Sequence, residues 1–159
     1  MNKSILLVLS LALAVACGKK EASAEDNYQP GGGEATTEAA DPASYDPKRG
    51  EGKFDTVELG ATLDQALAKK GEEVAGVKCA SCHKTTDEKL VGPGWKGVTE
   101  RRKPEWIMNF ITNPDPMIDK DPELQAQLEI CLVRMPNQGL NDDEARQILE
   151  FMRKNDGVN

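Results

Sequence analysis

Residues 79–83 read Cys79-Ala80-Ser81-Cys82-His83. Two thiols separated by two residues and followed directly by a histidine are the C-x-x-C-H signature of covalent haem attachment. One turn of chain presents both sulfurs to the two vinyl groups on one edge of a porphyrin, and the histidine ligates the iron through an imidazole nitrogen. The stretch therefore predicts a chain folded around one haem c, attached through Cys79 and Cys82 and ligated by His83.

The same cysteines have three other interpretations. A disulfide between Cys79 and Cys82 is compatible with an oxidising compartment. A thioredoxin-like redox pair needs a βαβ context, of which the sequence shows no sign. A zinc site needs four ligands, and His83 together with the distant Cys131 would have to complete it. Haem attachment is the interpretation that the contiguous motif favours.

The second axial ligand has to differ in type, because His83 is the only histidine in the chain. Methionine is the usual partner in electron-transfer cytochromes, where its thioether raises the reduction potential. Met135 stands before Pro136, which keeps this segment out of a helix. Met117 lies in another proline-containing loop and remains a competitor. Met108 and Met152 fall on predicted apolar helix faces, so we expect Met135 to be the ligand.

Composition narrows the class of protein. The chain has 159 residues and a net charge of −7, which makes nucleic acid an unsuitable partner. Aromatic residues make up only 4% and the mean hydropathy is −0.55. A buried cofactor would supply the apolar mass that the side chains lack.

The N-terminus has the features of an export signal. Lys3 precedes an apolar run over residues 5–16, which is too short to cross a bilayer as a helix. The run ends at Cys17, as in a bacterial lipoprotein cleavage box, so we expect residues 1–16 to be a signal peptide and Cys17 to be lipidated. Ordinary cleavage that leaves Cys17 as a free thiol is the alternative. Both place the mature protein outside the cytoplasm, on the periplasmic side of a bacterial membrane.

Two further regions follow the signal. Residues 17–52 are rich in Gly, Ala, Ser, Thr, Pro and acidic side chains, which predicts a flexible, lipid-anchored acidic tether. An alternative for the part near Tyr45 and Phe54 is an irregular arm packed on the domain. Residues 53–159 are predicted to form the folded domain.

Helical signals cover this domain, and no stretch shows the alternation of a strand. A first helix is expected from near Thr62, which forms a capping box with Gln65, to Lys78. A second opens at Pro104 and stops at Pro114. A third follows Asp121 as its N-cap, and the last follows Asn141, with Glu144 completing a capping box. The fold class is therefore all-α, a small helical domain wrapped around one haem.

Over residues 62–155 the chain resembles the class I monohaem cytochromes c. Besides the haem motif, four pieces carry the resemblance, in the family's order: Lys70-Gly71-Glu72-Glu73-Val74 of its N-terminal helix, the loop Val91-Gly92-Pro93-Gly94-Trp95-Lys96-Gly97, the distal Met135-Pro136, and Leu140-Asn141-Asp142-Asp143-Glu144-Ala145 leading to Phe151.

The resemblance implies further roles. The carbonyl of Pro93 accepts a hydrogen bond from the ring of His83. Gly71 marks the crossing of the first and last helices, with Phe151 against it. Trp95, where the family usually has leucine, walls the haem. Trp106 reaches a haem propionate or is a plain core residue. The family gives Cys131 no role, and its place in an apolar stripe predicts a buried thiol.

Electron transfer is the function that the resemblance implies. We expect a monomeric one-electron carrier that takes electrons from a quinol-oxidising complex and passes them to a terminal oxidase or a periplasmic reductase. A small haem peroxidase or a haem-based gas or redox sensor, each with an open iron site, is the alternative. Residues 78–103 carry seven basic and three acidic side chains, a local net charge of +4. This segment is either ordinary solvated charge or a docking face for an acidic redox partner.

Overall fold

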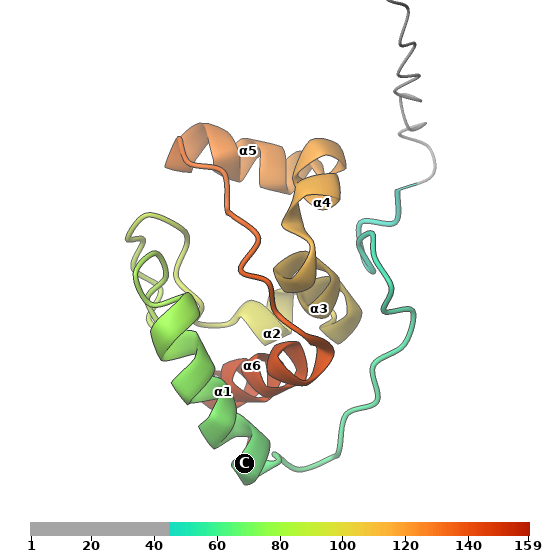
Figure 1. Cartoon of the computed structure of the whole chain (residues 1–159), viewed down its shortest axis with the longest axis vertical. Helices are drawn as coiled ribbons and strands as arrows, with labels where there is room; N and C mark the ends of the chain where they lie inside the picture. The colour runs from blue at the N-terminus through green and yellow to red at the C-terminus, as the bar shows by residue number, and fades with distance from the viewer. Residues whose placement is uncertain (1–44) are drawn as a thin grey trace, which may run out of the picture. The chain divides into compact units, whose positions relative to one another are not determined.

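The computed structural model describes residues 45–159. The predicted signal peptide, Cys17 and most of the predicted tether lie outside the described residues. Within them the chain forms helices and no strand, so the all-α prediction is confirmed. The helices are α1 (Gln65–Lys78), α2 (Val98–Arg101), α3 (Pro104–Thr112), α4 (Pro114–Lys120), α5 (Pro122–Cys131) and α6 (Asp142–Asn155) (Figure 1). None of these helices is long and apolar enough to cross a membrane.

The first and last helices cross at a glycine. Gly71 is buried in the middle of α1, and a side chain there would overlap the backbone of Gln147 and Ile148 in α6. A mid-helix glycine costs about 1 kcal/mol relative to alanine, and this close approach is its physical reason. The expected crossing is therefore present. Phe151 of α6 packs edge to face on Trp95, with ring centroids 6.3 Å apart.

Side-chain caps set where the helices begin. At α6 the expected capping box is present, because the Asn141 side chain accepts from the Glu144 amide at 2.9 Å and the Glu144 carboxylate accepts from the Asn141 amide at 3.0 Å. Asp121 caps α5 as predicted. Helix α1 begins later than predicted, with Asp64 instead of Thr62 as its cap, because the Asp64 carboxylate accepts from two amides of the first turn.

The segment after α3 differs from the expected loop. Pro114 ends α3 but also occupies the first turn of α4. Backbone N–H groups in the first turn have no partner within the helix, so a proline there costs no hydrogen bond. Met117 is consequently a helical residue and is fully buried in the core. The expectation that Met117 projects from irregular backbone is wrong for this reason.

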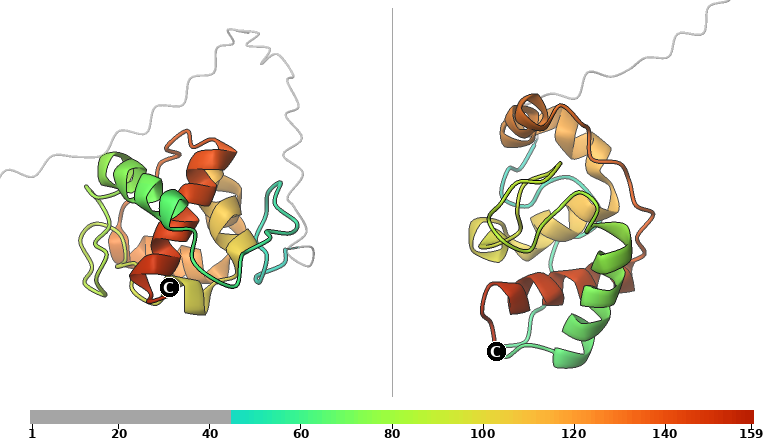
Figure 2. Two further views of the ribbon diagram at one scale, coloured as in Figure 1. Left: turned by 90° about the horizontal axis from the view of Figure 1, so that it is seen from below. Right: turned by 90° about the vertical axis from the view of Figure 1, so that its left-hand side faces the viewer.

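Residues 45–63 form an arm along the outside of the helices, drawn in teal in the left view of Figure 2. Residues 45–52 were predicted to belong to the tether, yet Gly50 is buried and the Tyr45 hydroxyl donates to Asp121 at 2.6 Å. Asn109 of α3 holds the next part, because its side chain accepts from the Phe54 amide at 2.9 Å and donates to the Phe54 carbonyl at 3.0 Å. This part of the chain is thus the packed arm that was the alternative to a tether.

Candidate functional site

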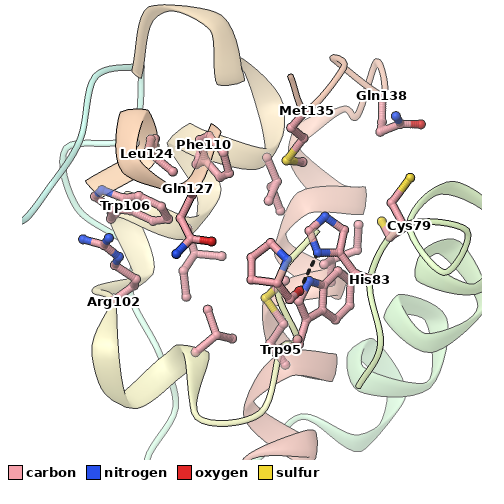
Figure 3. Close-up of a pocket in the computed structure, with 18 of the residues that line it drawn as sticks. Cys79, His83, Trp95, Arg102, Trp106, Phe110, Leu124, Gln127, Met135 and Gln138 are labelled. Carbon is pink, nitrogen blue, oxygen red and sulfur yellow. Dashed lines mark hydrogen bonds between the residues drawn. The ribbon is translucent and has the colours of Figure 1, made fainter. Parts of the chain in front are cut away.

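A cavity of about 660 Å³ lies between the loop that follows α1, the segment before α6, and helices α2, α3, α5 and α6 (Figure 3). Its volume is within the range of roughly 300–1,000 Å³ typical of sites for small molecules and cofactors. The structure brings all the predicted site residues of the domain to its walls: Cys79, Cys82, His83, Pro93, Trp95, Trp106 and Met135.

A tight turn at the end of α1 positions the cysteines and the histidine. The amides of Cys82 and His83 both donate to the carbonyl of Cys79 at 3.0 Å. Both thiols are free, and burial raises the pKa of the Cys79 thiol, an effect that Lys78 partly offsets. The contiguous motif is therefore folded so that two thiols and one imidazole border the same cavity.

The His83 ring is fixed in one orientation. Its Nδ1 lies 2.8 Å from the carbonyl oxygen of Pro93, the contact that the family resemblance implied. Because a carbonyl oxygen can only accept, the proton sits on Nδ1, and the lone pair of Nε2 is available to a metal. Gly92 lies against the same ring, and a side chain at Gly92 would overlap the imidazole.

The methionines differ in whether they line the main cavity and in whether they belong to a helix. Met135 lines the main cavity from the irregular segment before α6. Met117 does not line this cavity, and a side chain on Gly50 would overlap its thioether. Met152 also borders the cavity but belongs to the buried face of α6. Met135 is thus the methionine that reaches the cavity from outside the helices.

Trp95 forms part of the wall beside the histidine. Its side chain is buried, and its ring centroid lies 5.7 Å from that of His83 at an interplanar angle of 31°. Phe151 of α6 packs edge to face against Trp95, which lines the cavity between the loop and α6.

Trp106 forms the wall at the other end, and its polar contact differs from the expected one. The indole N–H donates to the carboxylate of Asp121 at 3.2 Å. The guanidinium of Arg102 lies 4.2 Å from the centre of the Trp106 ring and also pairs with Glu123. Because Asp121 already accepts from this indole, the proposed hydrogen bond from Trp106 to a propionate has no support here.

Several residues at the site were not identified from the sequence. Gly92 stands directly before Pro93, and the resemblance to a family loop could have drawn attention to it. Arg102 and Asp121 had no such signal, since their importance depends on contacts between α2, α3 and α5. Tertiary contacts of this kind leave no local pattern in one sequence.

A smaller cavity of about 100 Å³ shares walls with the main one, including His83 and Met135. Cys131 lines it from the end of α5 and is partly exposed. The prediction of a buried Cys131 thiol is wrong, because the last turn of α5 has few neighbours and Ile130 and Leu132 beside it are exposed.

The residues present fit a haem c. Two thiols at the spacing needed for thioether bonds border a largely apolar cavity together with an imidazole whose Nε2 is free. A thioether sulfur borders the same cavity from another segment (Figure 3). The described residues hold no group of three or more His, Cys, Asp and Glu side chains that would suit a metal ion alone.

Comparison with known proteins agrees with this chemistry. A family model described as "Cytochrome c" matches residues 68–156. The solved structure of a cytochrome c from Rhodothermus marinus is 34% identical, covers 73% of this chain and 97% of its own, and superposes with a TM-score of 0.65. An engineered cytochrome c from the same organism gives a TM-score of 0.64, and its form bound to a carbene intermediate gives 0.61. No curated protein matches the chain.

Proposed function

Because this chain belongs to the cytochrome c family, whose members carry covalent haem c and generally transfer electrons, we propose that it is a one-electron carrier in which His83 and Met135 would ligate the haem iron. The observation that carries this proposal is the fixed His83 ring, with Nδ1 bonded to Pro93 and Nε2 free, bordering the same cavity as the Met135 thioether.

Each residue has a defined task in this mechanism. Cys79 and Cys82 would hold the haem through thioether bonds, and the turn at the end of α1 fixes their spacing. The Pro93 carbonyl orients His83 and increases its strength as a donor. Trp95 and the apolar walls keep water from the cavity. When bound, the haem supplies a one-electron Fe(III)/Fe(II) couple.

With His83 and Met135 both bound to it, the iron would have no free position for a substrate, which favours a carrier over an enzyme. A peroxidase needs an open iron and an acid–base residue beside it, and the chain has no second histidine to provide one. A gas or redox sensor, in which a small molecule displaces Met135, is the alternative. The engineered Rhodothermus marinus protein with a carbene intermediate belongs to the same fold, so the alternative needs a direct test.

We further propose an exported location and a place in a respiratory chain. The signal over residues 1–16 and lipidation of Cys17 would hold the protein at the periplasmic side of a bacterial membrane. Its electrons would come from a quinol-oxidising complex and go to a terminal oxidase or a periplasmic reductase. Metabolic labelling with a radioactive fatty acid tests the anchor: label is expected in the wild type and lost in Cys17→Ala, and an unlabelled wild type would contradict it.

The basic segment 78–103 remains our candidate for partner docking. Within the part of the chain that the structure describes, three of its cations pair with carboxylates: Lys78 with Glu144, Lys84 with Glu88, and Arg102 with Glu123. Lys96, Arg101 and Lys103 have no ion pair there. If these cations steer an acidic partner, the electron-transfer rate falls as salt rises. A rate independent of salt would contradict steering.

A potentiometric titration with carbon monoxide as a probe tests the carrier function. The carrier is expected to titrate reversibly with one electron per chain, and its reduced form is expected not to bind carbon monoxide under native conditions. Rapid binding of carbon monoxide by the folded, reduced protein would favour the sensor or enzyme alternative.

A further inference from the structure

Asp121 is a buried carboxylate that the proposed electron transfer does not use directly. It is 1% exposed and stands between α4 and α5. One oxygen accepts from the amides of Glu123 and Leu124 at 2.8 and 3.2 Å. The other accepts from the Tyr45 hydroxyl at 2.6 Å and the Trp106 indole at 3.2 Å. One side chain thus joins the arm, the wall of the main cavity and the start of α5.

The four contacts of this carboxylate all have the same direction. All four of its hydrogen bonds come from donors, and an ionised carboxylate is the form that only accepts. In the described residues Asp121 forms no ion pair with a lysine or arginine. Burial and the hydrogen bond to Asp121 raise the pKa of Tyr45, as expected beside a negative charge.

The charge lies one side chain behind the cavity wall. Trp106 lines the main cavity and donates to Asp121, and Leu124, whose amide Asp121 caps, lines the cavity as well. The nearby cation Arg102, stacked on Trp106, has Glu123 as its own partner. Asp121 therefore has no ion-pair partner of its own beside the cavity.

We propose that Asp121 is a positioning residue for Trp106 and the arm whose buried negative charge lowers the reduction potential of the bound haem. Reduction adds one electron from the redox partner, with no bond made or broken and no proton taken up at Asp121. A fixed anion in a region of low dielectric opposes that addition and so stabilises the oxidised form. The inference rests on the haem occupying the main cavity, as proposed above.

The test is the reduction potential of the full-length, haem-loaded chain. Asp121→Asn keeps a good N-cap for α5 and removes the charge. We expect the equilibrium constant for reduction to rise roughly tenfold, which is about 59 mV for a one-electron couple. Asp121→Ser, another N-cap residue, is expected to shift the potential in the same direction and provides a second neutral variant if the first folds poorly.

Two controls separate charge from packing. Tyr45→Phe loosens the arm but leaves the carboxylate charged, so the potential is expected not to rise. Glu129→Gln removes an exposed, solvent-screened charge from α5. The equilibrium constant for reduction is expected to change less than twofold in this variant. Potentials unchanged in both Asp121 variants, or a rise in Tyr45→Phe equal to that in Asp121→Asn, would overturn the inference. If the wild type shows no sulfur-to-iron absorption band, ligation by Met135 is refuted. The comparison of reduction potentials between wild type and Asp121 variants remains valid in that case.

Discussion

The imidazole of His83 is held by backbone that lies nine and ten residues further along the chain. The Pro93 carbonyl fixes its Nδ1 proton, and Gly92 leaves the space that the ring occupies. The residues of the haem motif were predictable because attachment chemistry requires them at fixed, contiguous spacing. Asp121 was recognised as a helix cap but not as the acceptor for Tyr45 and Trp106, because those partners lie 76 and 15 residues away.

We predict that Gly92→Ala displaces the ring of His83 and leaves the C-x-x-C-H motif intact. The new methyl group would overlap the His83 ring, so the ring has to shift or the loop has to move, at a cost of about 1–3 kcal/mol. The expected result is a partly high-spin absorption spectrum and a lower midpoint of chemical unfolding. Pro93→Ala is the matched control, because it retains the backbone carbonyl that His83 needs. Equal spectra for Gly92→Ala and the wild type would contradict close contact at Gly92.

The helices were predictable where a cap and an apolar stripe coincide, as at α5 and α6. Pro114 shows where such signals become ambiguous, because a proline is compatible with both the end of one helix and the first turn of the next. The sequence pattern gave the stop of α3 and missed α4. The short α2 was also missed, since four residues show no helical periodicity.

For α6 we predict a pH-dependent contribution from Glu144. The hydrogen bond from the Asn141 amide, and to a lesser extent Lys78, lowers the pKa of Glu144 in the folded protein. A lowered folded pKa means that the stabilisation is present above the pKa of the unfolded chain, about 4.3, and is lost as the pH falls through the folded value.

Glu144→Gln isolates this contribution, because glutamine also completes a capping box but carries no charge. The variant is expected to have a lower free energy of unfolding than the wild type at pH 7, and the difference is expected to shrink below about pH 4. Chemical denaturation at a series of pH values measures it. A difference that stays constant from pH 7 to pH 3 would contradict a charge effect.

For the whole molecule, the arm extends the domain beyond the boundary that composition suggested. Low apolar content predicted a tether over residues 17–52. Composition cannot predict single contacts such as Tyr45 with Asp121 or Phe54 with Asn109. The arm packs on α3 and α4, and its start lies at Asp121, beside the wall of the main cavity. The rest of the predicted tether stays a prediction.

We predict that Asn109→Ala releases the arm. Asn109 is fully buried and holds the backbone of Arg49 and Phe54 by three hydrogen bonds. Loss of these partners is expected to cost about 1–3 kcal/mol and to speed proteolytic cleavage within residues 45–63. Asn113→Ala, an exposed position without a side-chain cap bond, is the control and is expected to behave like the wild type. Equal cleavage rates for Asn109→Ala and Asn113→Ala would show that the arm is held by other contacts.

The absorption spectrum of the purified holoprotein, oxidised and then reduced, shows which side chains ligate the iron. We predict a low-spin haem with the weak red band of sulfur-to-iron ligation in the wild type and in Met117→Ala, which removes a core side chain outside the cavity. The band is expected to be lost in Met135→Ala. A band that disappears only in Met117→Ala, or a wild type that is high-spin with an open iron, would contradict the assignment of His83 and Met135 as the ligands of an electron carrier.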